Sequence, residues 1–160
     1  MADGFTMSFD ASGLMAEFDQ LDLDARELVR PAAQAGAQVF YDEVLRRVPV
    51  AATGHKRKGG RVIPPGALKG SIYQAYSADH STPQAATYHV SWNARKAPHG
   101  HLIENGHWTK VVGKNGPLKP HWVPAQPFIR SSYDARVAAA EKAASDVLDK
   151  GIADALEKLG

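Results

Sequence analysis

A helical pattern of apolar residues runs from about Asp24 to Val48. Steps of three and four separate its apolar positions, which places them on one face of a helix: Val29, Ala33, Gly36, Phe40 and Val44. Because Pro31 lacks an N–H and clashes inside a helix, we expect the regular helix to start near Arg30 with Pro31 in its first turn, unless a kink joins it to a preceding turn. Pro49 is expected to end the helix.

The flanks and one side of this helix carry further signals. Residues 12–22 predict a short amphipathic helix opened by Ser12, so residues 1–22 are expected to be an N-terminal arm or a short helix. Small side chains crowd one side of the main helix and would let another helix or a sheet approach closely: Ala32, Ala33, Ala35, Gly36 and Ala37.

The longest helical pattern closes the chain, from Phe128 to Leu159. Its apolar positions keep helical spacing, while Glu, Lys and Asp fill the other faces: Val137, Ala140, Ala144, Val147, Leu148, Ile152 and Leu156. Gly151 weakens this helix by roughly 1 kcal/mol and is a point at which it can bend.

Two stretches between the helices, residues 70–78 and 86–94, are expected to be strands, and the polar "DHSTPQ" between them predicts a hairpin connection. Each strand places three side chains on one face: Ile72, Gln74 and Tyr76 in the first, Tyr88, Val90 and Trp92 in the second. The order of elements indicates an α+β fold, in which a small antiparallel sheet packs with a long N-terminal-half helix and a long C-terminal helix. We expect one domain over residues 1–160 with extended loops.

Two basic segments rich in Gly and Pro interrupt this scheme, at residues 54–67 and 110–123. No regular element fits the first, and "KNG" in the second predicts a tight turn between two short strands. We expect both loops to be mobile in the free protein and to order on a partner. The first loop carries four cations that suit contact with phosphates or with an acidic protein surface: Lys56, Arg57, Lys58 and Arg61.

Composition narrows the class of protein. The 160 residues are 44% hydrophobic and carry a formal net charge of +2, so contact with nucleic acid would rest on a local patch rather than on the whole surface. The absence of cysteine excludes disulfides and thiolate chemistry and suits a reducing cytoplasm. No apolar run approaches the roughly 20 residues that span a bilayer, and the N-terminus lacks an apolar signal core, so we expect no membrane contact and no export.

One cluster has the residue types of a metal or acid–base site: His99, His101, Glu104 and His107. Its spacing differs from the His-Glu-x-x-His pattern, in which two histidines four apart share a helix face and bind zinc. The structural alternative is a helical turn in which Glu104 binds backbone groups or a nearby cation. We favour the structural alternative, and because no serine lies in a nucleophile motif and no glycine-rich loop has a phosphate-binding pattern, we expect no enzymatic activity, catalytic residue, cofactor or metal.

Four segments in order, "RRVPVAATG", "GALKGSIYQAY", "APHGHLIENGHW" and "VPAQPFIRSSYDA", resemble one family. They are similar to the neck or tail-completion proteins of long-tailed bacteriophages, the minor tail protein Z type, over roughly residues 25–155. The matching positions are Pro49, Thr53, Gly54, Leu68, Ser71, Ile72, Glu104, Gly106, Pro127 and Phe128. The chain departs from the family pattern in the insertion "HKRKGGRVIPPGA" and in the residues from His99 to Ile103, which replace an aromatic.

The resemblance implies a mechanical role at the junction of tail and head. It implies that the chain assembles as a homo-oligomeric ring, a hexamer or dodecamer, and contacts head-connector and tail-terminator or tail-tube proteins, with packaged DNA as a further contact. Its expected location is the virion, and the host cytoplasm during assembly. Glu104 and Gly106 would then be structural, the glycine for a turn closed to other residues and the glutamate for holding that turn or a subunit contact.

Two alternatives from other classes remain at this stage. One is a small nucleic-acid-binding module that uses the basic loop with Trp92, Trp108 or Trp122 as stacking surfaces. The other is a metal-dependent hydrolase built on the histidine cluster.

Overall fold

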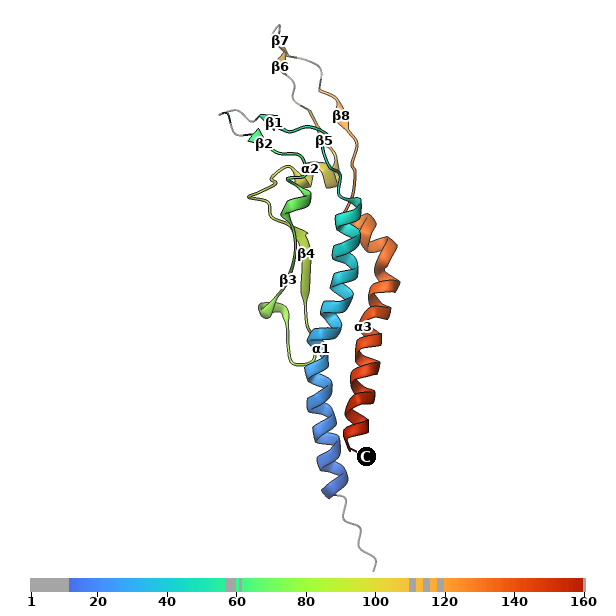
Figure 1. Ribbon diagram of the computed structural model, residues 1–160. Helices are drawn as coiled ribbons and strands as arrows, with labels where there is room; N and C mark the ends of the chain where they lie inside the picture. Colours follow the sequence, from blue (N-terminus) through green and yellow to red (C-terminus); the bar gives the residue numbers. More distant parts are fainter. Residues whose placement is uncertain are drawn as a thin grey trace, which may run out of the picture.

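The computed structural model describes residues 12–56, 60, 62–109, 112–113, 116–117 and 120–159. Two long helices form a rod, a β-hairpin lies along it, and two narrow arms project from one end (Figure 1). The α+β fold expected from the sequence is confirmed: long N-terminal-half and C-terminal helices pack with a small antiparallel sheet.

The first helix, α1, spans Ser12–Arg47 without interruption and contains Pro31. The expectation that the regular helix begins near Arg30 is therefore wrong, and residues 12–22 are the first turns of the same helix. Pro31 is exposed, so its ring points away from the core and the helix loses mainly one backbone hydrogen bond. α1 contacts α3 on both sides of the proline, at Leu28 and at Gly36, and this packing favours a continuous helix.

The last helix, α3 (Arg130–Leu159), runs antiparallel to α1 and begins two residues later than expected. The predicted close approach on the small-residue side of α1 is confirmed. A Cβ atom at Gly36 would lie 3.1 Å from the carbonyl oxygen of Ala140, and one at Gly151 would meet the Leu28 side chain. The two backbones can approach this closely because glycine and alanine occupy the contact.

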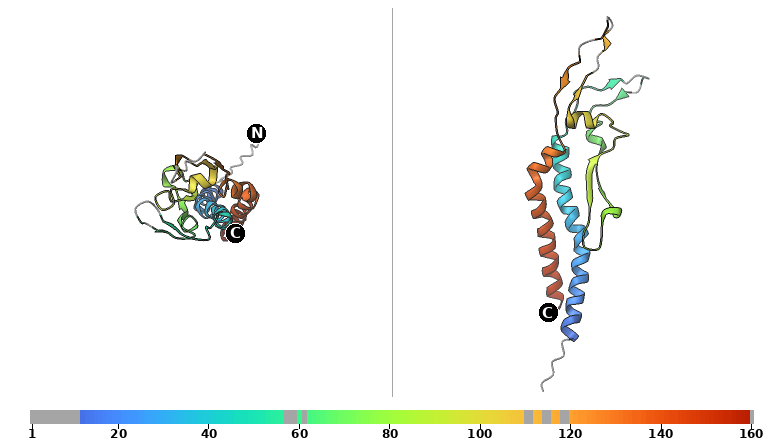
Figure 2. Two further views of the ribbon diagram at one scale, coloured as in Figure 1. Left: turned by 90° about the horizontal axis from the view of Figure 1, so that it is seen from above. Right: turned by 180° about the vertical axis from the view of Figure 1, so that it is seen from behind.

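The predicted hairpin is formed by β3 (Ile72–Tyr76) and β4 (Tyr88–Trp92). The strands pair antiparallel, with Gln74 opposite Val90, and the connection between them contains a short 3-10 turn, η2 (Ala78–His80). Viewed from above, α1 lies between this hairpin and α3 (Figure 2). The first helix is thus covered on two sides, and it contributes Ala32, Ala37 and Val44 to the buried residues.

The two arms consist of two-residue strands. In the first arm, β1 (His55–Lys56) pairs with β2 (Val62–Ile63), although residues 54–67 were expected to hold no regular element. In the second, β5 (His107–Trp108) pairs with β8 (Trp122–Val123), and β6 (Val112–Gly113) pairs with β7 (Gly116–Pro117), as the tight-turn signal predicted. Cross-strand pairing satisfies backbone groups that an irregular loop would leave to water, which is why these segments form ladders.

The main apolar core lies where α1, the hairpin and α3 meet beneath the arms. Its buried members are Val44, Val48, Leu68, Ile72, Ala97 and Phe128. Leu68 precedes the 3-10 turn η1 (Lys69–Ser71), and a short helix, α2 (Gly100–Asn105), covers the core from above. We call this end of the rod, which carries the arms and α2, the arm-bearing end (Figure 1). The opposite end, where α1 extends past the last turn of α3, is called the helical end.

Candidate partner interface at the arm-bearing end

Glu104, on α2, caps the start of the last helix. Its carboxylate accepts hydrogen bonds from three consecutive backbone N–H groups, those of Phe128 (2.7 Å), Ile129 (3.0 Å) and Arg130 (3.1 Å). The Arg130 side chain closes the contact by donating to the carboxylate and to the backbone carbonyl of Glu104. The first N–H groups of a helix have no partner within the helix, and an anion there is also favoured by the helix dipole. Glu104 therefore joins α2 to α3 across a separation of more than twenty residues.

The environment of Glu104 favours its charged form. Burial raises the pKa of its carboxyl group. Four hydrogen bonds lower the pKa by a larger amount in total: those from the backbone N–H groups of Ile129, Arg130 and Phe128, and the one from the Arg130 side chain. The net effect is a pKa below the usual value. The carboxylate is thus an anion committed to backbone donors.

Gly106 ends α2 with a backbone conformation that side chains rarely adopt. Its φ is 72° and its ψ is 169°. A Cβ atom there would lie 2.7 Å from the Trp122 ring and 2.8 Å from the carbonyl oxygen of Val123. The structural reading of Glu104 and Gly106 agrees with these contacts: the glycine makes the turn into the second arm, and the glutamate holds the helix that follows the arm.

The structure does not assemble the histidine cluster into a metal site. Among the residues that the structure describes, no three His, Asp or Glu side chains are placed to hold an ion. His101 is exposed on α2, His107 faces the Leu102 carbonyl at 3.4 Å, and Glu104 is occupied by backbone N–H groups. The geometry therefore gives no support to the hydrolase alternative.

The residues that carry the family resemblance meet at this end of the rod. Leu68, Ile72 and Phe128 belong to one buried cluster, and Phe128 donates its N–H to Glu104. The hydroxyl of Ser71 is buried and donates to the Leu68 carbonyl at 2.7 Å. Three segments that are distant in the sequence thus build one junction between the body and the arms.

The remaining motif residues lie at its edge. Pro49 and Thr53 line a small groove of about 150 Å³ together with Leu68. A Cβ atom at Gly54 would lie 2.8 Å from the Ile63 carbonyl oxygen, so glycine permits the close pairing of the first arm. Pro127 is exposed just before the capped residues. None of these positions brings reactive groups together.

The tryptophans divide into one core residue and one exposed pair. Trp92 is partly buried and packs edge-on against Phe128 of the core, with ring centroids 5.7 Å apart. Trp108 and Trp122 face each other across β5 and β8 at 5.6 Å, and they are 65% and 48% exposed. An exposed pair of such large rings is unusual on a free surface, which makes these two tryptophans a candidate binding surface.

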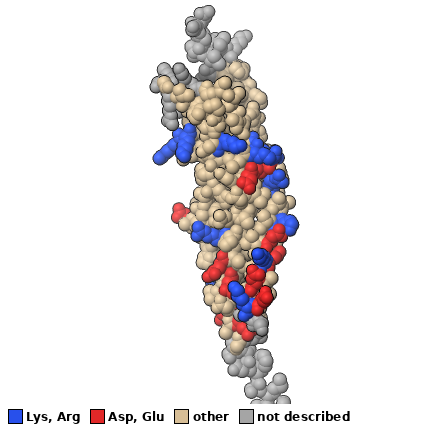
Figure 3. Space-filling view, viewed as in Figure 1, with Lys and Arg blue, Asp and Glu red and all other residues tan. Residues whose placement is uncertain are grey.

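Charge is strongly segregated along the chain. Residues 48–133, which contain the arms, α2 and the hairpin, hold eleven Lys and Arg against two acidic residues, a formal +9. The remaining residues, mainly α1 and α3, hold eight Lys and Arg against fifteen acidic residues, a formal −7. On the face shown in Figure 3, most acidic side chains lie over the lower half, toward the helical end. The small net charge of the whole chain conceals this division.

Of the four cations singled out in the first loop, Arg57, Lys58 and Arg61 lie outside the described residues, as does the side chain of Lys56. Other basic side chains at this end are described. Lys69 on η1, and Arg95 and Lys96 in the turn after β4, are all exposed. The turn is held to the end of η1, because Asn93 donates its N–H to the Ser71 carbonyl at 2.8 Å.

A charged cluster that the sequence did not single out joins α1 to α3. Glu43 is buried and accepts hydrogen bonds from Arg46, Arg47 and Arg136, the last at 3.1 Å from α3. Hydrogen bonds from Arg46 and Arg47 are the largest causes that hold the pKa of Glu43 well below its usual value. The i,i+3 and i,i+4 spacing to the two neighbouring arginines was visible in the sequence, but the contact with Arg136 was not.

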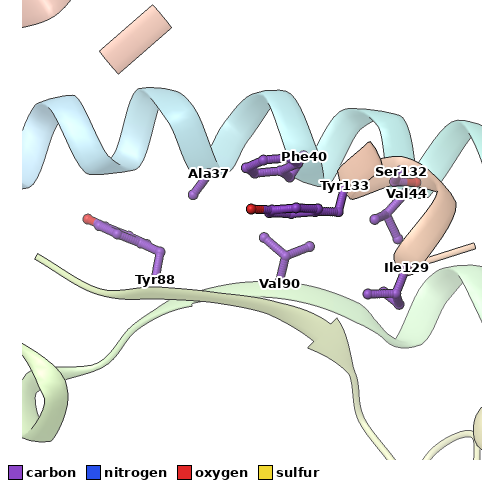
Figure 4. Close-up of a pocket in the computed structure, with 8 residues that line it drawn as sticks. All are labelled: Ala37, Phe40, Val44, Tyr88, Val90, Ile129, Ser132 and Tyr133. Carbon is purple, nitrogen blue, oxygen red and sulfur yellow. The ribbon is translucent and has the colours of Figure 1, made fainter. Parts of the chain in front are cut away.

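An apolar groove of about 250 Å³ lies between α1, α3 and β4 (Figure 4). Phe40 and Tyr133 stack above it with centroids 5.3 Å apart, and Tyr88 and Val90 lie below. Its one aliphatic hydroxyl, that of Ser132, donates to the Phe128 carbonyl. Among the residues that line the groove, no base accompanies this hydroxyl, so the groove has the character of a packing defect or a docking surface.

Comparison with known proteins finds no counterpart for this chain: no family model, no curated protein and no solved structure matches it. Within the described residues, no helix combines the length and apolar character that crossing a bilayer requires.

Proposed function

We propose that this chain is a structural component of a tailed bacteriophage, a neck or tail-completion protein that joins the tail to the head. The observation that carries the proposal is the chemical difference between the two ends of the rod. α1 alone has 36 residues, which at 1.5 Å per residue is about 54 Å. Such a rod can hold two partners apart while contacting each with a different surface.

Each end exposes large apolar side chains, and the charged residues around them are acidic at one end and basic at the other. At the helical end, Met15 and Phe18 are 58% and 57% exposed on the turns of α1 that extend past α3, amid acidic residues. At the arm-bearing end, Trp108 and Trp122 are exposed in a basic segment. Apolar side chains surrounded by charge are typical of surfaces that bind proteins and choose among them by charge.

The arms support assembly in another way. Among the described elements, the two-residue strands β6 and β7 contact little beyond each other. A projecting hairpin of this kind gains most of its stability when a neighbouring subunit covers it. We infer a homo-oligomeric ring, in which an arm of one copy lies on a different surface of the next.

Inactivation of the gene in the phage or prophage that encodes the chain tests this function. The proposal predicts DNA-filled heads and finished tails that remain unjoined, counted by negative-stain electron microscopy of the lysate, and it predicts that a plasmid copy of the gene restores joined particles. Joined, infectious particles in the absence of the chain would refute a role at the junction.

The ring is tested separately by native mass spectrometry of the purified protein and of particles that contain it. A closed oligomer such as a hexamer or dodecamer, in solution or released from particles, is the expected result. A strictly monomeric chain in both preparations would contradict the ring, without bearing on whether the chain joins tail to head.

A further inference from the structure

The arm-bearing end has three properties that together point to one kind of ligand. It presents two exposed indole rings, it is strongly basic, and its described residues between 80 and 133 carry no exposed carboxylate. Of the two acidic residues in the segment 48–133, Asp79 lies on η2 between β3 and β4, and Glu104 is buried against backbone N–H groups. A polyanion could therefore lie along the second arm, α2 and the turn after β4 without meeting an exposed carboxylate among their described residues.

The indole pair indicates that the ligand has flat groups with free faces as well as phosphate groups. The planes of Trp108 and Trp122 are inclined at 61°, so the two rings cannot both stack on one flat group. They offer faces in two directions, which suits two bases that have separated from each other. Bases in a duplex have no free faces, whereas those of a single strand do, and stacking on aromatic side chains is a common mode of single-strand binding.

The described cations extend the surface from the arm toward the hairpin. Lys69, Arg95 and Lys96 are exposed on the two segments that enter and leave the β3–β4 hairpin at its arm-bearing end. These segments are joined by the hydrogen bond from Asn93 to Ser71. A strand that continues from the tryptophans toward the hairpin would bring its phosphates to these side chains.

We propose that the arm-bearing end binds nucleic acid, with the Trp108–Trp122 pair stacking on unpaired bases and Lys69, Arg95 and Lys96 contacting the phosphates. The proposal does not depend on the role at the head–tail junction, because it concerns the isolated chain. It favours single strands over duplexes, and an acidic protein surface is the competing ligand.

Fluorescence anisotropy with the full-length protein tests the site. The probe is a dye-labelled, mixed-sequence single-stranded DNA of about 20 nucleotides, longer than the roughly 4–16 nucleotides of common single-strand sites, and a duplex of equal length is the comparison. We expect tighter binding of the single strand, with affinity that falls as salt rises because counterions are released. Absence of binding at low salt, or tighter binding of the duplex, would overturn the proposal.

Trp108→Ala separates stacking from charge. Trp108 is the more exposed ring and, unlike Trp122, does not pack against Gly106, so its loss should leave the fold intact by circular dichroism. Loss of one stacked base should weaken single-strand binding by about fivefold or more, while Trp108→Phe should retain most of the affinity. The matched control is Phe18→Ala, which removes an equally exposed aromatic ring at the helical end. Equal losses in Trp108→Ala and Phe18→Ala would contradict the site.

The triple change of Lys69, Arg95 and Lys96 to Ser tests the phosphate contacts. The slope of log affinity against log salt should fall by about 0.7 for each contact that is lost. Changing Lys150 and Lys158, exposed near the end of α3, should leave the slope unaltered. An unchanged slope in the triple variant would refute these contacts. Binding of a poly-glutamate peptide as tight as that of DNA, independent of Trp108, would assign this end to an acidic protein instead.

Discussion

The cap formed by Glu104 gives the most specific prediction about the fold. Three backbone N–H groups at the start of α3 share this one carboxylate, and Glu104 is only 5% exposed. Removing the acceptor in Glu104→Ala would leave these donors to whatever water can reach them. Loss of a cap costs about 0.5–2 kcal/mol, and hydrogen bonds to a charged group about 1.5–3 kcal/mol. The variant no longer buries a carboxylate, so the cost of desolvating that charge is removed and offsets part of the lost hydrogen-bond energy. We therefore expect a loss of about 2–3 kcal/mol in the free energy of unfolding.

Glu104→Gln isolates the charge, because glutamine keeps the shape and one acceptor oxygen. It should cost about 1–2 kcal/mol, roughly half of the loss in Glu104→Ala. Urea denaturation followed by circular dichroism measures both values, and Glu157→Gln, an exposed carboxylate near the end of α3, is the matched control that should change little.

The pH dependence provides a second readout with a definite sign. The folded-state pKa of Glu104 lies below its usual value, so its stabilisation is fully present above the unfolded pKa of about 4.3 and is lost as pH falls through the folded value. The stability gap between the wild type and Glu104→Gln should therefore shrink between neutral and strongly acidic pH. A gap that stays constant with pH, or no gap at pH 7, would refute the role assigned to this carboxylate.

Three further substitutions test the packing, each measured as a change in the urea midpoint or Tm. Gly106→Ala should destabilise the fold by more than 1 kcal/mol, because its φ is positive and its Cβ would clash with Trp122; unchanged stability would contradict the observed turn. Pro31→Ala should stabilise α1, by up to about 3 kcal/mol, because it restores a helical hydrogen bond; a loss of stability would mean that the proline shape is required. Gly151→Ala should destabilise despite the higher helix propensity of alanine, since its Cβ would overlap the Leu28 side chain, and Leu28→Ala in the same chain should relieve the clash; additive losses would exclude this contact.

Much of the scaffold followed from periodicity. The hairpin and the last helix follow from local patterns that need no distant partner. The small residues around Gly36 predicted the close approach of a helix or a sheet, and the structure shows that it is the helix α3. The continuity of α1 could not be predicted from the sequence. Local propensity assigns Pro31 the full free-energy cost of a proline inside a helix, whereas the packing that offsets this cost comes from a helix one hundred residues away.

The site was less predictable, since its contacts join distant segments. The sequence indicated that Glu104 binds a turn, but not that the turn begins α3. It offered three tryptophans as equivalent candidates, and only the strand register showed that Trp92 is in the core and that Trp108 faces Trp122. Charge segregation could have been read from the sequence by counting within segments, because thirteen of the seventeen acidic residues fall on the two long helices.

The most direct test of the two-ended rod is a joining assay in an extract that lacks the chain but contains heads and tails. Purified protein is added, and infectious particles are counted. The account predicts that wild-type protein restores joining, while variants altered at one end only, Met15→Ser with Phe18→Ser or Trp108→Ser with Trp122→Ser, fold normally yet fail to join. Full joining by both end variants, or no joining by the wild-type protein, would contradict the account.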